Sequence, residues 1–225
     1  MTTVFFRQLY LRFGLCLLLL VPLMSAPLGR AQAADKLLVL GDSISAAYGI
    51  DESQGWVQLL RDRLEKGGEP IEVVNASISG ETSSGGLARL PRLLQEHQPR
   101  WLIVELGGND GLRGYPPVAL QRNLQQMVKL AEKAGAEVLL LGMRMPPNYG
   151  RAYTEAFAAV YPKVAKAAQV PLVSFFLEPV ALLEGTMQSD GIHPTAAAQP
   201  ALLDHVWPCI QVLLGQSVDE QSCTP

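Results

Sequence analysis

Short apolar runs alternate with longer amphipathic segments along most of this chain, and this alternation restricts the fold more than any other feature. Five runs are rich in Leu, Val and Ile, as buried parallel strands are. They cover residues 36–40, 71–75, 101–106, 137–141 and 171–175. Strands that alternate with helical segments are typical of a parallel sheet. We therefore expect an open three-layer α/β domain in which ligands bind beyond the carboxyl ends of the strands.

The segments between these runs carry apolar residues at helical spacing. The clearest of these expected helices begins at Pro116-Pro117 and stops at Gly135. Proline is common at the start of a helix and glycine just after its end. Further helices are expected around 56–64, 87–94, 153–168 and 196–214, with Pro162 kinking or dividing the third of these. The inward face of the 116–135 helix is expected to be Leu120, Leu124, Met127, Val128 and Ala131.

The first 33 residues have the pattern of a cleavable secretory signal peptide. Arg7 and Arg12 precede an apolar run at 13–24, which is followed by small residues and Ala31-Gln32-Ala33. The run is short against the ~20 residues of a membrane-spanning helix, so a membrane anchor is the less favoured alternative. We expect cleavage after Ala33, one domain over 34–225 with a short tail from about residue 215, and a periplasmic or secreted protein without stable membrane insertion.

The net charge bears on which partners the protein can bind, and the cysteines bear on how the C-terminal tail could be attached. The chain has 18 basic and 21 acidic residues, and loss of the three arginines in the first 33 residues moves the net charge from −3 to −6. Nucleic acid is therefore not an expected partner. Cys209 and Cys223 remain after cleavage, and an oxidising compartment permits either a bridge between them or two free thiols.

A serine follows the first apolar run. In Gly41-Asp42-Ser43 it lies at the carboxyl end of the expected strand, where we expect a helix to begin. Ser43 is thus either an exposed nucleophile or a helix cap. The chain contains no Gly-x-Ser-x-Gly pattern, which excludes the nucleophile elbow of the α/β-hydrolases.

A histidine that could activate this serine occurs near the other end of the chain. Asp190 precedes His193 by three residues in a segment rich in turn formers. An imidazole can remove a serine proton, and a carboxylate can fix the tautomer of that imidazole. The alternative for His193 is a loop histidine bonded to backbone. His97 and His205, near a helix end and in the last expected helix, are weaker candidates for the base.

Two glycine-rich segments could supply the hydrogen-bond donors that a developing oxyanion needs. In residues 75–82, Gly80 could present its backbone N–H, and in residues 107–110 the Asn109 amide could reach the site while Gly107 and Gly108 leave room. Each segment could instead be a tight turn or a helix cap. Their positions after the second and third runs favour a shared site with Ser43.

Taken in order, these segments resemble the four sequence blocks of the GDSL/SGNH hydrolase family. The matching residues are Gly41-Asp42-Ser43, Gly80, Gly107-Gly108-Asn109-Asp110 and Asp190-Gly191-Ile192-His193. The resemblance implies a flavodoxin-like sheet of order 2-1-3-4-5, with Ser43 as nucleophile, His193 as base and Asp190 as its partner. It also implies an oxyanion hole made by the Ser43 and Gly80 N–H groups and the Asn109 side chain, with Asp42 supporting the nucleophile turn.

The same resemblance implies a reaction. It is the hydrolysis of acyl thioesters and carboxylic esters, including lysophospholipids and arylesters, without a metal or organic cofactor. We expect a monomer that takes small-molecule substrates. Four residues in the loops after the third and fourth runs either line an apolar trough for the acyl chain or merely pack the loops. They are Leu112, Met145, Pro146 and Tyr149.

Two other interpretations remain open at this point. A non-catalytic flavodoxin-like protein could use the glycine-rich loops to hold a phosphate or a flavin. Asp190, His193 and the lack of a phosphate-loop pattern argue against it. Alternatively, the same catalytic residues could serve an esterase that acts on acetylated carbohydrates, which would differ in its preferred acyl length.

Overall fold

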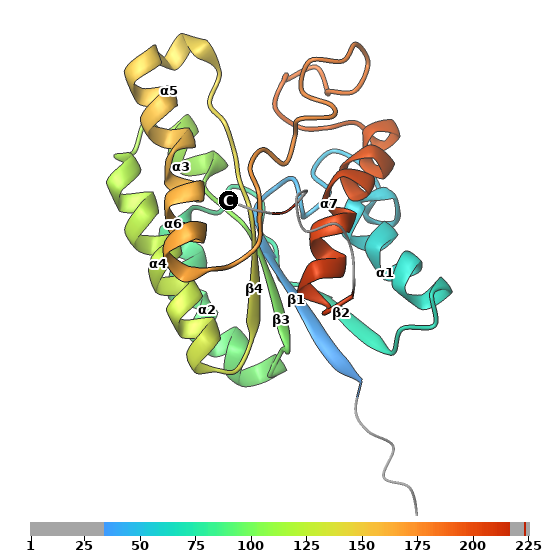
Figure 1. Cartoon of the computed structure of the whole chain (residues 1–225). Coiled ribbons are helices and arrows are strands. Elements are labelled where there is room, and N and C mark those ends of the chain that lie inside the picture. Colours follow the sequence, from blue (N-terminus) through green and yellow to red (C-terminus); the bar gives the residue numbers. More distant parts are fainter. Residues whose placement is uncertain (1–33, 217–222, 224–225) are drawn as a thin grey trace, which may run out of the picture. The chain divides into compact units, whose positions relative to one another are not determined.

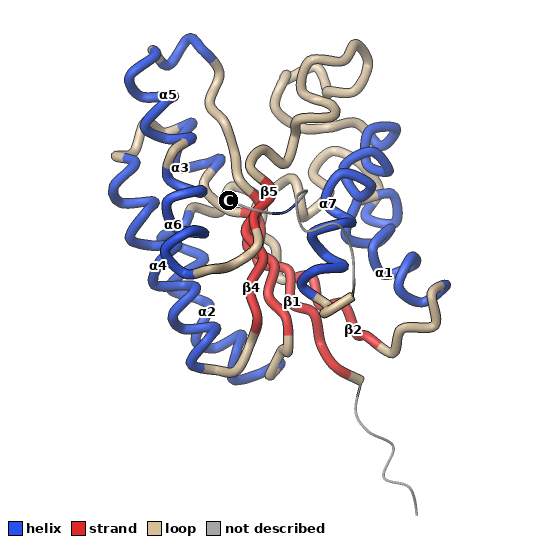
Figure 2. Tube along the Cα trace, in the orientation of Figure 1, coloured by secondary structure: helices blue, strands red, loops and turns tan. Residues whose placement is uncertain are grey.

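A five-stranded parallel sheet forms the centre of the domain. The computed structural model describes residues 34–216 and Cys223, so the expected signal peptide and most of the tail lie outside the described residues. The strand order is β2-β1-β3-β4-β5, and each neighbouring pair is parallel (Figure 2). This is the expected order. The strands are β1 (Asp35–Gly41), β2 (Ile71–Asn75), β3 (Trp101–Glu105), β4 (Glu137–Leu141) and β5 (Leu172–Val173).

Helices cover both faces of the sheet, which is why the central strands are mostly apolar. One face is covered by α1 (Trp56–Lys66) and α7 (Gln199–Leu213), and the other by α2 (Ser83–His97), α4 (Pro117–Lys133) and α6 (Val160–Ala168) (Figure 1). The shorter elements are α3 (Gly108–Leu112), α5 (Arg151–Ala158) and the 3-10 turns Glu52–Gln54, Pro147–Tyr149 and Ala196–Ala198.

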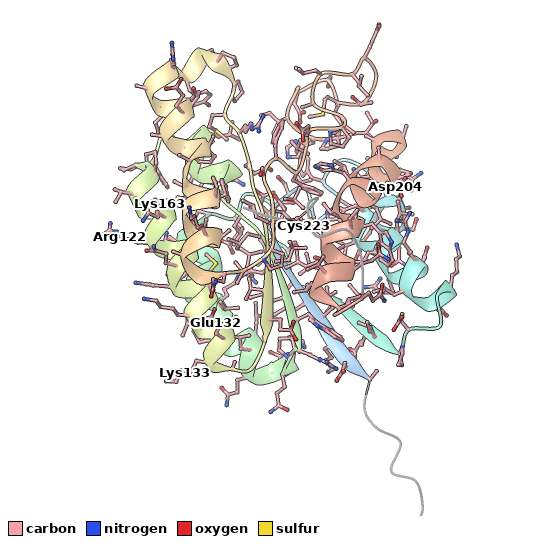
Figure 3. All side chains as sticks on the ribbon, viewed as in Figure 1. Arg122, Glu132, Lys133, Lys163, Asp204 and Cys223 are labelled. Atoms are coloured by element: carbon pink, nitrogen blue, oxygen red, sulfur yellow. A yellow bond between two sulfur atoms is a disulfide. The ribbon has the colours of Figure 1, made fainter. Side chains whose placement is uncertain are left out.

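Helix α4 confirms the face that the spacing predicts. Its buried residues are the five expected ones, Leu120, Leu124, Met127, Val128 and Ala131. The opposite side of the helix carries Arg122 and Lys133, whose side chains point away from the core in Figure 3. Pro117 occupies its first turn, where the missing N–H costs no hydrogen bond, and Gly135 follows its end with a positive φ of 84°.

Three local expectations need correction. No helix begins at Ser43, because residues 43–49 form successive turns and α1 starts only at Trp56. The segment 153–168 is divided at Ala159, and Pro162 lies in the first turn of α6, where a proline removes no helical hydrogen bond. The last strand, expected over 171–175, has only two residues, and β5 is an edge strand that pairs only with β4.

No helix among residues 34–216 is long and apolar enough to cross a membrane.

A disulfide joins Cys209 in α7 to Cys223, which is labelled in Figure 3. The two residues are 14 apart in sequence and both are buried. In the chain-entropy account, closing a loop of this length restricts the unfolded chain and stabilises the fold by about 3 kcal/mol.

We therefore expect Cys223→Ser to lower the free energy of unfolding by about 3 kcal/mol in urea titrations. Reduction of the wild-type protein should lower it by a similar amount and should not affect the variant further. An unchanged urea midpoint in the variant would show that the bridge does not stabilise the fold.

Candidate active site

Ser43 lies in a tight turn directly after β1. The Asp42 side chain shapes this turn, since its Oδ1 accepts a hydrogen bond from the Ile44 N–H at 3.1 Å. The Asp42 carbonyl accepts from the Ala46 N–H, and the Ser43 carbonyl accepts from the Tyr48 N–H, both at 3.0 Å. These bonds hold Ser43, which is 8% exposed, at the carboxyl edge of the sheet.

The structure brings Ser43, His193 and Asp190 together although the serine and the histidine are 150 residues apart. The Ser43 Oγ is 2.8 Å from His193 Nε2, and His193 Nδ1 is 2.7 Å from Asp190 Oδ2. An ionised carboxylate can only accept hydrogen bonds, so the imidazole proton lies on Nδ1. Nε2 is then free to accept from the Ser43 hydroxyl. This arrangement allows the imidazole to take the serine proton.

Asp190 is kept ionised by the turn in which it lies. Its Oδ1 accepts from the Ile192 N–H at 2.9 Å and from the His193 N–H at 3.0 Å, and Gly191 between them has a positive φ of 68°. The hydrogen bond from the His193 side chain, followed by these two backbone bonds, lowers the pKa of Asp190 from 3.8 to about 2. Its carboxylate therefore carries a negative charge throughout the neutral range.

Two residues that sequence reasoning missed support His193. The Tyr48 ring lies against the imidazole with a centroid separation of 4.5 Å. The Gln188 amide donates to the Tyr48 carbonyl at 2.8 Å and to the Pro194 carbonyl at 3.0 Å, so it ties the histidine loop to the serine loop. No motif or spacing relates these residues, because they meet only when the two loops fold together.

Three segments after three neighbouring strands are joined at the site. The Ile78 N–H donates to the Gly41 carbonyl at 3.1 Å, which places the loop after β2 beside the end of β1. Asn109 Nδ2 donates to Asp42 Oδ2 at 3.1 Å, which places the start of α3 there as well. Within the described part of the chain, the N–H groups of Ser43 and Gly80 donate to no protein acceptor. Both remain available to a ligand oxygen.

Gly107 and Gly108 allow Asn109 to approach the Ser43 turn. Gly107 has a φ of 121°, and a Cβ there would overlap the Tyr161 hydroxyl, which donates to the Leu106 carbonyl at 3.0 Å. A Cβ at Gly108 would lie 3.2 Å from Asp42 Oδ2. Larger residues at either position would push Asn109 away from the turn.

Asp42 has an environment opposite to that of Asp190. It is 2% exposed, and burial raises the pKa of its carboxyl from 3.8 to about 6. Hydrogen bonds from Ile44 and Asn109, together with the positive charge of His193 when protonated, oppose this rise without cancelling it. Asp42 therefore titrates in a higher pH range than Asp190.

The weaker histidine candidates lie away from this cluster. His205 Nε2 is 3.0 Å from the Phe175 carbonyl, a structural contact of α7, and His97 ends α2. Within residues 34–216 and at Cys223, no three His, Cys, Asp or Glu side chains are grouped so that they could hold a metal ion.

The expected acyl-binding residues gather at the carboxyl ends of β3 and β4. The Tyr149 hydroxyl donates to the Leu112 carbonyl at 3.1 Å, and Met145 packs so closely on Gly111 that a Cβ there would overlap its sulfur. Leu112, Met145 and Tyr149 are half-buried, whereas Pro146 is exposed. The loops thus pack on each other and keep part of their apolar surface open to solvent.

The raised pKa of Asp42 predicts how stability depends on pH. The folded protein holds this proton to higher pH than the unfolded chain does, so the stability associated with it is complete below about pH 4 and is lost as the pH rises through about 6. A change of one in pKa corresponds to about 1.36 kcal/mol, which makes the loss on the order of 3 kcal/mol.

Urea unfolding of wild type and Asp42→Asn between pH 4 and pH 7 measures this effect. We expect the free energy of unfolding of the wild type to fall relative to that of the variant over this interval. Parallel curves for the two proteins would contradict the buried, titrating state of Asp42.

Comparisons with known proteins agree with this arrangement. The chain is 59% identical over 182 residues to Esterase TesA of Pseudomonas aeruginosa, which covers 81% of this chain and 90% of that protein. It is 53% identical over 185 residues to the Thioesterase 1/protease 1/lysophospholipase L1 of Escherichia coli, with 82% and 88% covered. A crystal structure of the psychrotrophic esterase EstA from Pseudoalteromonas sp., inhibited by monoethylphosphonate, superposes with a TM-score of 0.77 at 40% identity and covers 81% of this chain and all of that one.

The family model described as the GDSL-like Lipase/Acylhydrolase family matches residues 39–200. This range contains the Ser43 turn, the glycine-rich segments after β2 and β3, and the loop that carries Asp190 and His193. The protein therefore belongs to the GDSL-like lipase/acylhydrolase family, also known as the SGNH hydrolases.

Proposed function

We propose that this protein is a serine esterase and thioesterase that hydrolyses acyl thioesters, carboxylic esters and lysophospholipids through an acyl-enzyme. The observation that carries the proposal is the continuous pair of hydrogen bonds from Ser43 Oγ to His193 at 2.8 Å and from His193 to Asp190 at 2.7 Å. The names of the relatives from Pseudomonas and Escherichia refer to the same classes of activity.

In the first half of the reaction, Ser43 Oγ attacks the acyl carbonyl carbon while His193 Nε2 accepts the hydroxyl proton. The charge that develops on the carbonyl oxygen is stabilised by the free N–H groups of Ser43 and Gly80 and by the Asn109 amide. The imidazolium is stabilised by the ionised Asp190. It then gives its proton to the leaving thiol or alcohol, and the acyl group stays on Ser43.

In the second half, water takes the place of the leaving group. His193 removes a proton from the water as its oxygen attacks the acyl-enzyme, and the same three donors hold the second oxyanion. Collapse of this intermediate returns the proton to Ser43 Oγ and releases the carboxylic acid. Only groups of the chain and one water are needed for this cycle.

The acyl chain is proposed to lie along Leu112, Met145, Pro146 and Tyr149. Support comes from their position in the segments that follow β3 and β4, since ligands bind at this edge of parallel sheets, and from the partial exposure of their apolar side chains. The flexible thioether of Met145 can adapt to acyl chains of different length.

The protein is proposed to act in the periplasm or outside the cell after export. The arginines and apolar run of the first 33 residues support this location, as does the Cys209–Cys223 disulfide, because disulfides persist in oxidising compartments.

Hydrolysis of p-nitrophenyl esters, acyl-CoA thioesters and lysophosphatidylcholine with increasing acyl length tests the proposed substrates. We expect turnover of all three classes, and a loss of about 10⁴-fold or more in kcat for Ser43→Ala. Ser53→Ala, which removes an exposed hydroxyl of the 3-10 turn Glu52–Gln54, is the matched control and should keep wild-type rates. Cleavage confined to acetyl esters would instead support an esterase for acetylated carbohydrates.

Replacement of Asn109 with alanine tests the oxyanion hole. Loss of one of the three donors should lower kcat by about 10²–10³-fold, while KM changes little because the donor acts mainly on the transition state. Gln126→Ala removes an exposed amide from α4 and serves as the control. Full activity of Asn109→Ala would exclude its side chain from the hole.

A further inference from the structure

Two buried carboxyl side chains, those of Asp42 and Glu105, lie beside the Ser43 turn. Only Asp42 has been given a role so far, since it holds this turn. Glu105 ends β3 and is paired in register with Gly41 at the end of β1. Its side chain is fully buried, and no lysine or arginine among the described residues forms an ion pair with Glu105 or with Asp42. A buried acid without a cation needs another explanation.

One oxygen of Glu105 is anchored by the turn itself. Its Oε2 accepts from the Ser45 hydroxyl at 2.8 Å and from the Asp42 N–H at 3.3 Å. The Ser45 hydroxyl in turn accepts from the indole N–H of buried Trp56 at 3.2 Å. A Cβ at Gly41 would lie only 2.9 Å from Oε2, so a glycine is needed for this close approach.

The other features of Glu105 fit a neutral acid. Its Oε1 is buried and receives no hydrogen bond from any described group, a situation that is far more costly for a carboxylate than for a carboxylic acid. Burial, together with the negative charge of Asp42, raises the pKa of Glu105 well above 4.5. Adjacent buried carboxyls do not both ionise readily.

The other groups around the pair add no permanent positive charge. Tyr161 from α6 lies near the pair, and burial, together with the negative charges of Asp110, Glu105 and Asp42, raises the pKa of its phenol. Ser45 and Trp56 are neutral, and Asp110 accepts hydrogen bonds from the N–H and hydroxyl of Ser83. His193 acts on Asp42 through its charge when it is protonated.

Asp42 connects this buried acid to the reacting groups. Its Oδ1 holds the Ile44 N–H of the Ser43 turn, and its Oδ2 holds Asn109 Nδ2, each at 3.1 Å. Since one Nδ2 hydrogen of Asn109 points to Asp42, the direction of the other hydrogen is fixed. Movement of the Asp42 carboxylate would therefore displace both the nucleophile turn and a donor of the oxyanion hole.

We propose that Glu105 is a positioning residue that stays protonated at neutral pH and donates a hydrogen bond to the Asp42 carboxylate, so that Asp42 keeps the Ser43 turn and the Asn109 amide in their catalytic orientation. This inference rests on the proposed function, because it assigns Glu105 a part in the same reaction. Glu105 itself touches no reacting atom and acts through Asp42.

Two substitutions separate the hydrogen bond from the charge. Glu105→Gln keeps a neutral donor and an acceptor, and we expect it to retain kcat within about threefold of wild type. Glu105→Leu removes both groups, and kcat should fall by about tenfold or more with little change in KM, because transition-state stabilisation is lost. Glu105→Leu also leaves the Ser45 hydroxyl and the Asp42 N–H without their acceptor, so some loss of stability is expected, and thermal unfolding shows whether the leucine variant folds. Wild-type kcat in Glu105→Leu, or an equal loss in both variants, would overturn the proposal.

A double-mutant cycle with Asn109→Ala distinguishes positioning from a general structural effect. If Glu105 acts through Asp42 and Asn109, then Glu105→Leu should lower kcat much less in the Asn109→Ala background than in wild type. The same fold-loss in both backgrounds would show that Glu105 does not act through the Asn109 amide.

The infrared spectrum reports the proton directly and does not depend on activity. At neutral pH the wild type should show the carbonyl band of a buried carboxylic acid, and Glu105→Gln should lack it. Absence of the band from the wild type would overturn the proposal even if the enzyme is active. Failure of the proposed function would be recognised separately, as equal hydrolysis rates for wild type and Ser43→Ala.

Discussion

Parallel pairing of β1 with β2 on one side and β3 on the other is the constraint on which the site depends. The register places Gly41 beside Glu105, so β1 and β3 end at the same level, and Val39 beside Asn75, so β2 ends two residues earlier at the same edge of the sheet. The loops that follow must therefore meet at one edge, and the hydrogen bonds from Ile78 to Gly41 and from Asn109 to Asp42 join them there. The site is assembled by the sheet, although its residues come from distant parts of the chain.

Two aspartates at this edge carry out opposite tasks because their surroundings differ. Asp190 is an exposed residue that receives two backbone hydrogen bonds and one from the imidazole, and the pKa of its carboxyl falls to about 2. Asp42 is buried beside another carboxyl, and its pKa rises to about 6. Burial favours the neutral form of an acid, whereas hydrogen-bond donors favour the charged form. In our account the first aspartate balances the charge of His193, and the second holds a turn and an amide in place.

Much of the fold could be predicted because it depends on local periodicity. The apolar runs gave the strands, and the spacing of Leu120, Leu124 and Met127 identified the buried face of α4. The turn after β1 was harder, since a serine near an expected helix start suggests a cap, whereas here Asp42 closes a turn and α1 begins later. The length of β5 could not be predicted either, because the length of an edge strand depends on how many of its residues pair with its one neighbour, here β4.

In the candidate site, too, residues in local motifs could be predicted, whereas residues that act through tertiary contacts could not. Ser43, Gly80, Asn109, Asp190 and His193 could be proposed from short motifs, because each motif lies next to a strand end or within a turn. Tyr48 and Gln188 could not, since they reach His193 only through folded loops. Glu105 had one visible signal, a single acid within an otherwise apolar strand, but its contact with Asp42 depends on strand register.

The most direct test of the central claim is the intact mass of the mature protein after treatment with an organophosphonate that reacts with activated serines. An activated Ser43 predicts one adduct per chain in the wild type, no adduct in Ser43→Ala, and greatly slowed labelling in a variant that lacks His193. A folded wild-type protein that gains no adduct, or a Ser43→Ala variant that is labelled equally, would contradict the acyl-enzyme mechanism.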